Sequence, residues 1–219
     1  MSQRRFFLTF IVTSLTVWTN IAVVGCSGTA TPAKKVSCFE PPHAKLEGPT
    51  NGFFTLQHDF SFFDSKGKQW KAPKATLSDG ASIPPIFLSL TQGQWSPRYA
   101  DAAVVHDAYC QRENKEGALF HQEKWQDVHR MFYEACRVAG SRALRAKVMY
   151  AAVYLGGPRW GDPRRSLESL PSEVLVGAFE KCKQWIEAKD PTIEEIDQWM
   201  TELEASLIRG DGSKPSWKE

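Results

Sequence analysis

The sequence predicts an α+β fold, in which a small antiparallel β region precedes a mainly α-helical body. Between residues 53 and 73, aromatic and polar residues surround a Lys66-Gly67 turn, a pattern typical of a β-hairpin. After Pro97, apolar residues recur every three or four positions, as they do along one face of a helix. The 42% hydrophobic and 24% charged composition is that of a globular protein, and 219 residues suffice for one domain with its own core.

Five helical segments are expected after the β region. Proline is tolerated in the first turn of a helix, so the first segment is expected to begin at Ser96-Pro97 and to run to Cys110. Thr192 and Glu195 fit a capping box at the start of the last. The other segments are expected at about 121–138, 141–157, 172–189 and 192–208. A short connection makes the first two helices an antiparallel pair.

The first 25 residues are typical of an export signal. A basic start, MSQRR, is followed by an uncharged apolar run from Phe6 to Val24 and then by Gly25-Cys26. These residues resemble the lipobox of bacterial lipoproteins, which implies cleavage before Cys26 and acylation of that cysteine, for example with palmitate. By the same resemblance, Ser27 favours the outer membrane of the cell envelope, with the protein facing the periplasm. The alternative is an uncleaved membrane anchor, because the run is nearly long enough to span a bilayer.

The remaining chain divides into four parts by composition. Residues 26–52 are small, polar and proline-dotted, and are predicted to be a flexible tether. Residues 53–170 are expected to form the α+β domain, 171–208 two C-terminal helices, and 209–219 a disordered tail. Loss of Arg4 and Arg5 with the signal leaves 25 basic and 25 acidic residues. A neutral body gives no reason to expect nucleic acid as a partner.

Four cysteines follow Cys26, at positions 38, 110, 136 and 182. In an oxidising compartment they allow two disulfide bonds in three possible pairings, and the sequence does not choose among these.

A histidine and an aspartate stand together in the apolar segment YADAAVVHDAYC, as His106 and Asp107. Asp127 lies 21 residues later, in the apolar stripe of the next helix. If the two helices are antiparallel, Asp127 can hold the His106 ring in one tautomer, which is the base and orienter pair of a hydrolytic site. Asp107, together with Asp79 in the segment SDGASIPP, can ligate a cation such as calcium that stabilises an oxyanion.

The same residues also fit a structural role. A histidine on an apolar helix face is more often a satisfied core residue than a catalyst, and the pair can be a buried polar clamp in a non-catalytic envelope module that binds a protein partner. A catalytic pair is expected to open onto a groove, whereas a clamp is expected to be sealed. His121 and His129 are predicted to lie on the solvated surface of the second helix.

Two family resemblances rest on these segments. The motifs WKAPK, SDGASIPP, AAVVHDAYC, MFYEAC and MYAAVYLGG resemble a domain of unknown function of bacterial and phage proteins, over residues 53–157. That resemblance implies no activity.

HDAYC, Asp127, FYEAC and YAAVYLGG are more weakly similar to secretory phospholipases of the A-two type. That resemblance implies a phospholipid substrate, His106 as the base, Asp107 as a calcium ligand and Asp127 as the orienter. The chain departs from the pattern before the His-Asp helix. SLTQGQWSPRY, with Gly93 alone, stands where those enzymes carry a glycine- and cysteine-bearing calcium loop.

Overall fold

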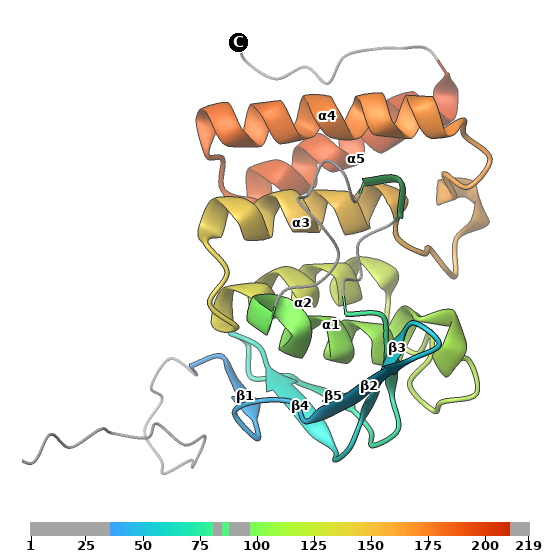
Figure 1. Ribbon diagram of the computed structural model, residues 1–219. Helices are drawn as coiled ribbons and strands as arrows, with labels where there is room; N and C mark the ends of the chain where they lie inside the picture. The colour runs from blue at the N-terminus through green and yellow to red at the C-terminus, as the bar shows by residue number, and fades with distance from the viewer. Residues whose placement is uncertain (1–35, 81–84, 88–96, 211–219) are drawn as a thin grey trace, which may run out of the picture.

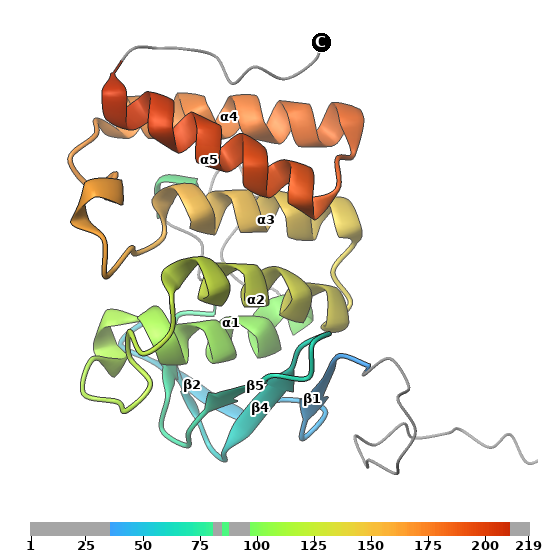
Figure 2. The ribbon, with the colours of Figure 1, turned by 180° about the vertical axis from the view of Figure 1, so that it is seen from behind.

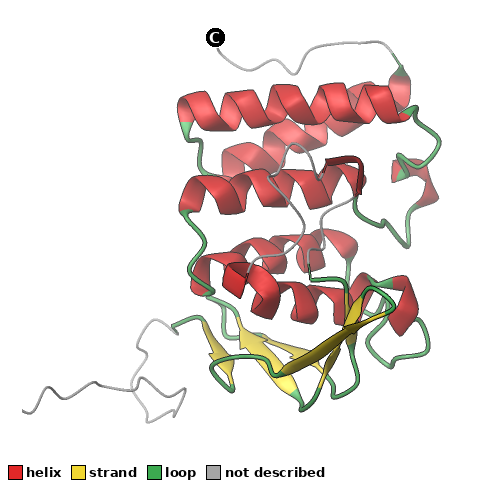
Figure 3. Cartoon of the chain, in the orientation of Figure 1, coloured by secondary structure: helices red, strands yellow, loops and turns green. Residues whose placement is uncertain are grey.

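Strands and helices occupy separate layers of the molecule, as the computed structural model shows for residues 36–80, 85–87 and 97–210 (Figure 1). The strands are β1 (Cys38–Glu40), β2 (Leu46–Thr50), β3 (Phe53–Leu56), β4 (Phe60–Phe63), β5 (Gln69–Ala72) and β6 (Leu77–Ser78). The helices are α1 (Pro97–Cys110), α2 (Trp125–Val138), α3 (Ala143–Gly156), α4 (Ser172–Lys189) and α5 (Ile193–Arg209). The predicted α+β class is confirmed, because the described strands precede the helical body in the chain and lie in a separate part of the molecule (Figure 3).

The strands form two small antiparallel sheets, with the orders β1-β4-β5 and β2-β3-β6. The expected turn at Lys66-Gly67 joins β4 to β5. Asp64 holds this turn, because its Oδ1 accepts the backbone N–H groups of Lys66 and Lys68, and its Oδ2 accepts the indole N–H of Trp70 at 3.0 Å. A single buried carboxylate therefore satisfies the donors that the tight turn would otherwise leave unpaired.

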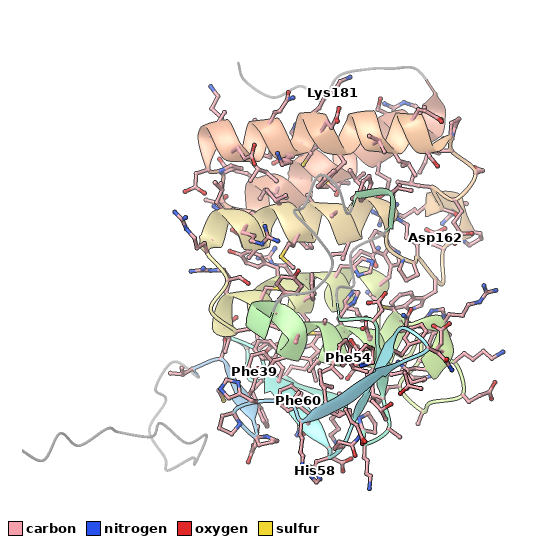
Figure 4. All side chains as sticks on the ribbon, viewed as in Figure 1. Phe39, Phe54, His58, Phe60, Asp162 and Lys181 are labelled. Carbon is pink, nitrogen blue, oxygen red and sulfur yellow. The ribbon has the colours of Figure 1, made fainter. Side chains whose placement is uncertain are left out.

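The sequence predicts a flexible tether for residues 26–52. In the structure, residues 38–40 of this segment form β1 and residues 46–50 form β2. β1 pairs with β4 in the register Phe39↔Phe62, and β2 pairs with β3. The rings of Phe39 and Phe60 stack with their centroids 5.3 Å apart, on the side of the sheet that faces the helices (Figure 4). Burial of this aromatic surface stabilises β1 and its pairing with β4. The proline-containing sequence around β1 does not by itself indicate a strand.

The helices form three successive layers above the sheets. α1 and α2 lie next to the strands, α3 packs on α2, and α4 and α5 cover α3 (Figure 2). α3 is buried from Ala146 to Leu155 because neighbours cover it from opposite sides. Its sequence is accordingly apolar all round, which is typical of a central helix. α5 begins as predicted, with Thr192 and Glu195 in a reciprocal capping box.

One buried carboxylate joins the loop after α3 to α5. Glu204 accepts hydrogen bonds from Arg165 and from the hydroxyl of Tyr154, and forms an ion pair with Arg159 at 3.0 Å. Two guanidinium groups and a hydroxyl compensate the cost of removing this carboxylate from water.

Cys110, Cys136 and Cys182 are free and buried, whereas Cys38 is disulfide-bonded. The two disulfide bonds that the sequence allows among these four cysteines therefore do not form. The apolar interior of the helical body explains the three free thiols, since a free cysteine behaves there as a small hydrophobic residue.

The expected signal peptide, Cys26 and residues 211–219 of the expected tail lie outside the described residues. Among the helices that the structure describes, none is both long and apolar enough to cross a membrane.

Candidate functional site

His106 lies in the middle of α1 and contacts a second histidine. Its Nε2 is 2.9 Å from Nδ1 of His129 on α2, and Nε2 of His129 is 3.2 Å from the carbonyl oxygen of Pro158. His106 is 1% exposed and His129 is 0% exposed. The structure thus contains a buried chain of hydrogen bonds that runs from α1 through α2 to the loop after α3.

The carbonyl of Pro158 fixes the tautomers of both rings. A carbonyl only accepts hydrogen bonds, so the proton of neutral His129 is assigned to Nε2. Nδ1 of His129 is then an acceptor, and Nε2 of His106 must donate to it. Nδ1 of neutral His106 is left with a lone pair. Gly157 permits this arrangement, because a Cβ there would come within 3.1 Å of Nε2 of His129.

Burial lowers the pKa of His129 well below 6.5, and the positive charges that His106 and Arg159 can carry lower it further. His129 is therefore neutral in the folded protein near neutral pH, as its acceptor role requires.

Asp107 connects α1 to the end of β6. The hydroxyl of Ser78 donates to Oδ2 of Asp107 at 2.6 Å and accepts the N–H of Gly80 at 3.1 Å. Asn114 supports the same junction, since its side chain bonds both backbone groups of Leu77 and the carbonyl of Asp107. The end of β6 is thus held against α1 through Leu77 and Ser78, and Gly80 is held to Ser78.

Cys110 completes a compact cluster with His106 and Asp107. Its Sγ is 3.3 Å from Nδ1 of His106, and the thiol donates to the His106 carbonyl at 3.3 Å. One ligand atom from each of the three residues lies within 4.8 Å of the other two. Burial raises the pKa of the Cys110 thiol well above 9.0, and the charges of Asp107 and Asp79 raise it further. Cys110 is therefore a neutral thiol in this environment and not an activated nucleophile.

The expected contact between His106 and Asp127 is wrong. Asp127 is exposed on α2, where it lines a polar cavity of about 620 Å³ with Arg130, Tyr150 and Asp197. Residues two apart on a helix point in nearly opposite directions, so His129 faces α1 and Asp127 faces away from it.

The expected surface position of His129 is also wrong. It lies four residues after Trp125 and three before Phe132, both of which are buried, so helical periodicity alone places it on the core face. His121 is half-buried and stacks on Trp160 with the ring centroids 4.3 Å apart. Asp79 is half-buried and follows β6 directly.

One family model matches the part of the chain that contains this cluster. Residues 54–153 match the family "Protein of unknown function (DUF1353)". The matched region runs from β3 into α3 and includes both α1 and α2. The match supports the expected resemblance to a domain of unknown function, over residues 54–153. The match assigns no activity.

Two curated proteins of Sinorhizobium fredii (strain NBRC 101917 / NGR234) are similar to the chain. The first, "Uncharacterized protein y4iH", is 36% identical over 129 residues, which are 58% of this chain and 51% of the relative. The second, "Uncharacterized protein y4jT", is 39% identical over 149 residues, or 68% of this chain and 42% of the relative. The chain thus spans about half the length of the curated relatives it matches. No solved structure matches it.

The lowered pKa of His129 predicts a loss of stability in mild acid. Because the folded-state pKa lies below the unfolded value of 6.5, the unfolded chain binds the proton first as the pH falls. The contribution of His129 to the free energy of unfolding should be constant above about pH 6.5 and decrease below it, by up to about 1.4 kcal/mol per pH unit.

Urea denaturation of the wild type and of His129→Gln at several pH values measures this effect. The decrease below about pH 6.5 should be shallower in His129→Gln, since that variant has lost the titrating ring. Equal slopes in the two proteins would contradict a depressed pKa at His129.

Proposed function

We propose that the domain is a non-catalytic module of an exported envelope protein, and that the His106–His129 pair is a structural connection within it. The observation that carries this proposal is burial. His106, His129 and Asp107 are at most 2% exposed, and each of them is hydrogen-bonded to another element of the fold. A sealed pair is what the clamp interpretation of the sequence predicts. A base that acts on an ester must instead reach its substrate.

The module is proposed to act through its outer surface. Its partner is then another envelope protein, and α4 and α5, which form the layer farthest from the strands, are the surface proposed for it (Figure 1).

A hydrolase of phospholipid-type esters is the second candidate, and one observation favours it. The hydrogen bonds through His129 to Pro158 leave a lone pair on Nδ1 of His106, which is the protonation state that a general base needs. His129 takes the place that the sequence gives to Asp127. A neutral imidazole stabilises an imidazolium less than a carboxylate does, so this base is weaker than the one expected from the sequence. Calcium on Asp107 and Asp79 stays a prediction.

The variant His106→Ala distinguishes the structural role of the pair from the hydrolase role. If the pair is a clamp, the change leaves Nδ1 of His129 buried without its donor and should lower the free energy of unfolding by about 1–3 kcal/mol. His58→Ala is a matched control, because His58 is exposed at the strand end of the molecule (Figure 4) and should change little. Chemical denaturation measures both variants.

The same proteins are then assayed for hydrolysis of a phospholipid in mixed micelles, with and without calcium. The clamp proposal predicts no hydrolysis above background by the wild type. Wild-type hydrolysis that drops by roughly two to four orders of magnitude in a fully stable His106→Ala variant would establish the hydrolase instead.

The envelope location is proposed from the export signal and from Gly25-Cys26. The expected result is that radiolabelled palmitate enters the wild-type protein in bacteria and that Cys26→Ser abolishes both labelling and signal cleavage. Labelling that persists in Cys26→Ser would contradict the lipobox interpretation.

Thiol counting on the denatured, unreduced protein adds a second measurement. The sequence holds five cysteines, and Cys110, Cys136 and Cys182 are free. Because Cys38 is disulfide-bonded, three free thiols are expected, and four or more would contradict this assignment of the cysteines.

A further inference from the structure

We propose that His106, Asp107 and Cys110 form a binding site for a divalent transition-metal ion of the zinc type. The ligand atoms are Nδ1 of His106, Oδ1 of Asp107 and Sγ of Cys110. This site differs from the calcium site expected from the sequence in both its residues and its ion. The proposal does not rest on the clamp or on the hydrolase, because either kind of domain can hold such an ion.

The two distances from Nδ1 of His106 to the other ligand atoms suit one ion. Nδ1 of His106 is 3.3 Å from Sγ of Cys110 and 3.6 Å from Oδ1 of Asp107. Zinc bonds of about 2.0–2.3 Å in tetrahedral geometry place ligand atoms roughly 3.3–3.8 Å apart. The three residues occupy positions i, i+1 and i+4 of the same helix, so the backbone of α1 fixes their spacing.

The surroundings orient two of the three ligands. A histidine that binds a metal usually donates its other ring N–H to a fixed acceptor, which sets the tautomer. Nε2 of His106 does so toward His129, and the Pro158 carbonyl in turn fixes His129. Asp107 is oriented by Ser78, whose hydroxyl donates to Oδ2, the carboxylate oxygen not assigned to the ion.

The donor types select the ion. Calcium and magnesium prefer oxygen ligands, whereas an imidazole nitrogen and a thiolate favour zinc and similar ions. A thiolate is formed when the metal displaces the thiol proton, and this proton is released to solvent. Without an ion the same thiol donates to the His106 carbonyl, as it does in the structure. Three protein ligands leave one tetrahedral position for water.

Cobalt(II) is the probe, because a cobalt–thiolate bond absorbs in the near ultraviolet. The full-length protein is stripped with a chelator and titrated with Co²⁺, and Zn²⁺ is then added in competition. We expect one Co²⁺ per chain, a thiolate-to-cobalt absorption band, and loss of that band on addition of Zn²⁺. The melting temperature should rise with either ion.

Two cysteine variants locate the site. Cys110→Ser should lose the band and bind Co²⁺ about 10- to 100-fold more weakly or worse. Cys136→Ser is the matched control, since Cys136 is also a free, buried thiol but lies on α2 outside the cluster, and it should keep both properties.

A wild-type protein that binds no Co²⁺, or binds it without the thiolate band, would overturn the proposal even if Cys110→Ser fails to fold. Loss of the band in Cys136→Ser with retention in Cys110→Ser would overturn it as well. Binding of calcium with no binding of Co²⁺ or Zn²⁺ would also overturn the proposal, and would favour the calcium site expected from the sequence.

Discussion

Burial of α1 on every side is the constraint on which the rest of the structure depends. The two sheets cover one side of the helix and α2 covers the other, so residues 99–110 are all buried. A polar group in such a position must be paired, because an unpaired one costs more than a hydrogen bond contributes. The paired polar side chains of α1 therefore explain how the surrounding segments are held.

Four polar side chains of α1 each bond a different segment. Asp101 accepts the N–H of Ala44 before β2, and Tyr109 accepts the N–H of Lys71 in β5. Asp107 bonds Ser78 at the end of β6, and His106 bonds His129 on α2. The β layer and the second helix thus dock on α1 through separate hydrogen bonds, each of which specifies one neighbour. The same arrangement gathers an imidazole, a carboxylate and a thiol, which gives the cluster its metal-binding chemistry.

Local sequence signals predicted those parts of the fold that local interactions determine. The capping box at Thr192 and the turn at Lys66-Gly67 lie where they are expected, because both depend on residues a few positions apart. β1 could not be predicted in this way. Its stability comes from pairing with β4, more than twenty residues later, and nothing in the residues around Cys38 indicates that partner.

The candidate site, too, could be predicted from the sequence only in part. Composition singles out His106 and Asp107, and both are buried. Asp127 was predicted as the partner of His106 because a carboxylate is the usual partner of a catalytic histidine. The helical period instead indicates His129, which lies on the buried face of α2. Which residue meets His106 is decided by how α1 and α2 pack, and a shift of two residues exchanges one helix face for the other.

A double-mutant cycle between His106 and His129 tests most directly whether the cluster is part of the architecture. The free energy of unfolding is measured for the wild type, His106→Ala, His129→Ala and the double variant. Since each single change leaves the other ring buried without its partner, the two effects should be non-additive, with a coupling energy of about 0.5–3 kcal/mol. Effects that add to within about 0.3 kcal/mol would contradict the account, because the two helices would then be held together without this bond.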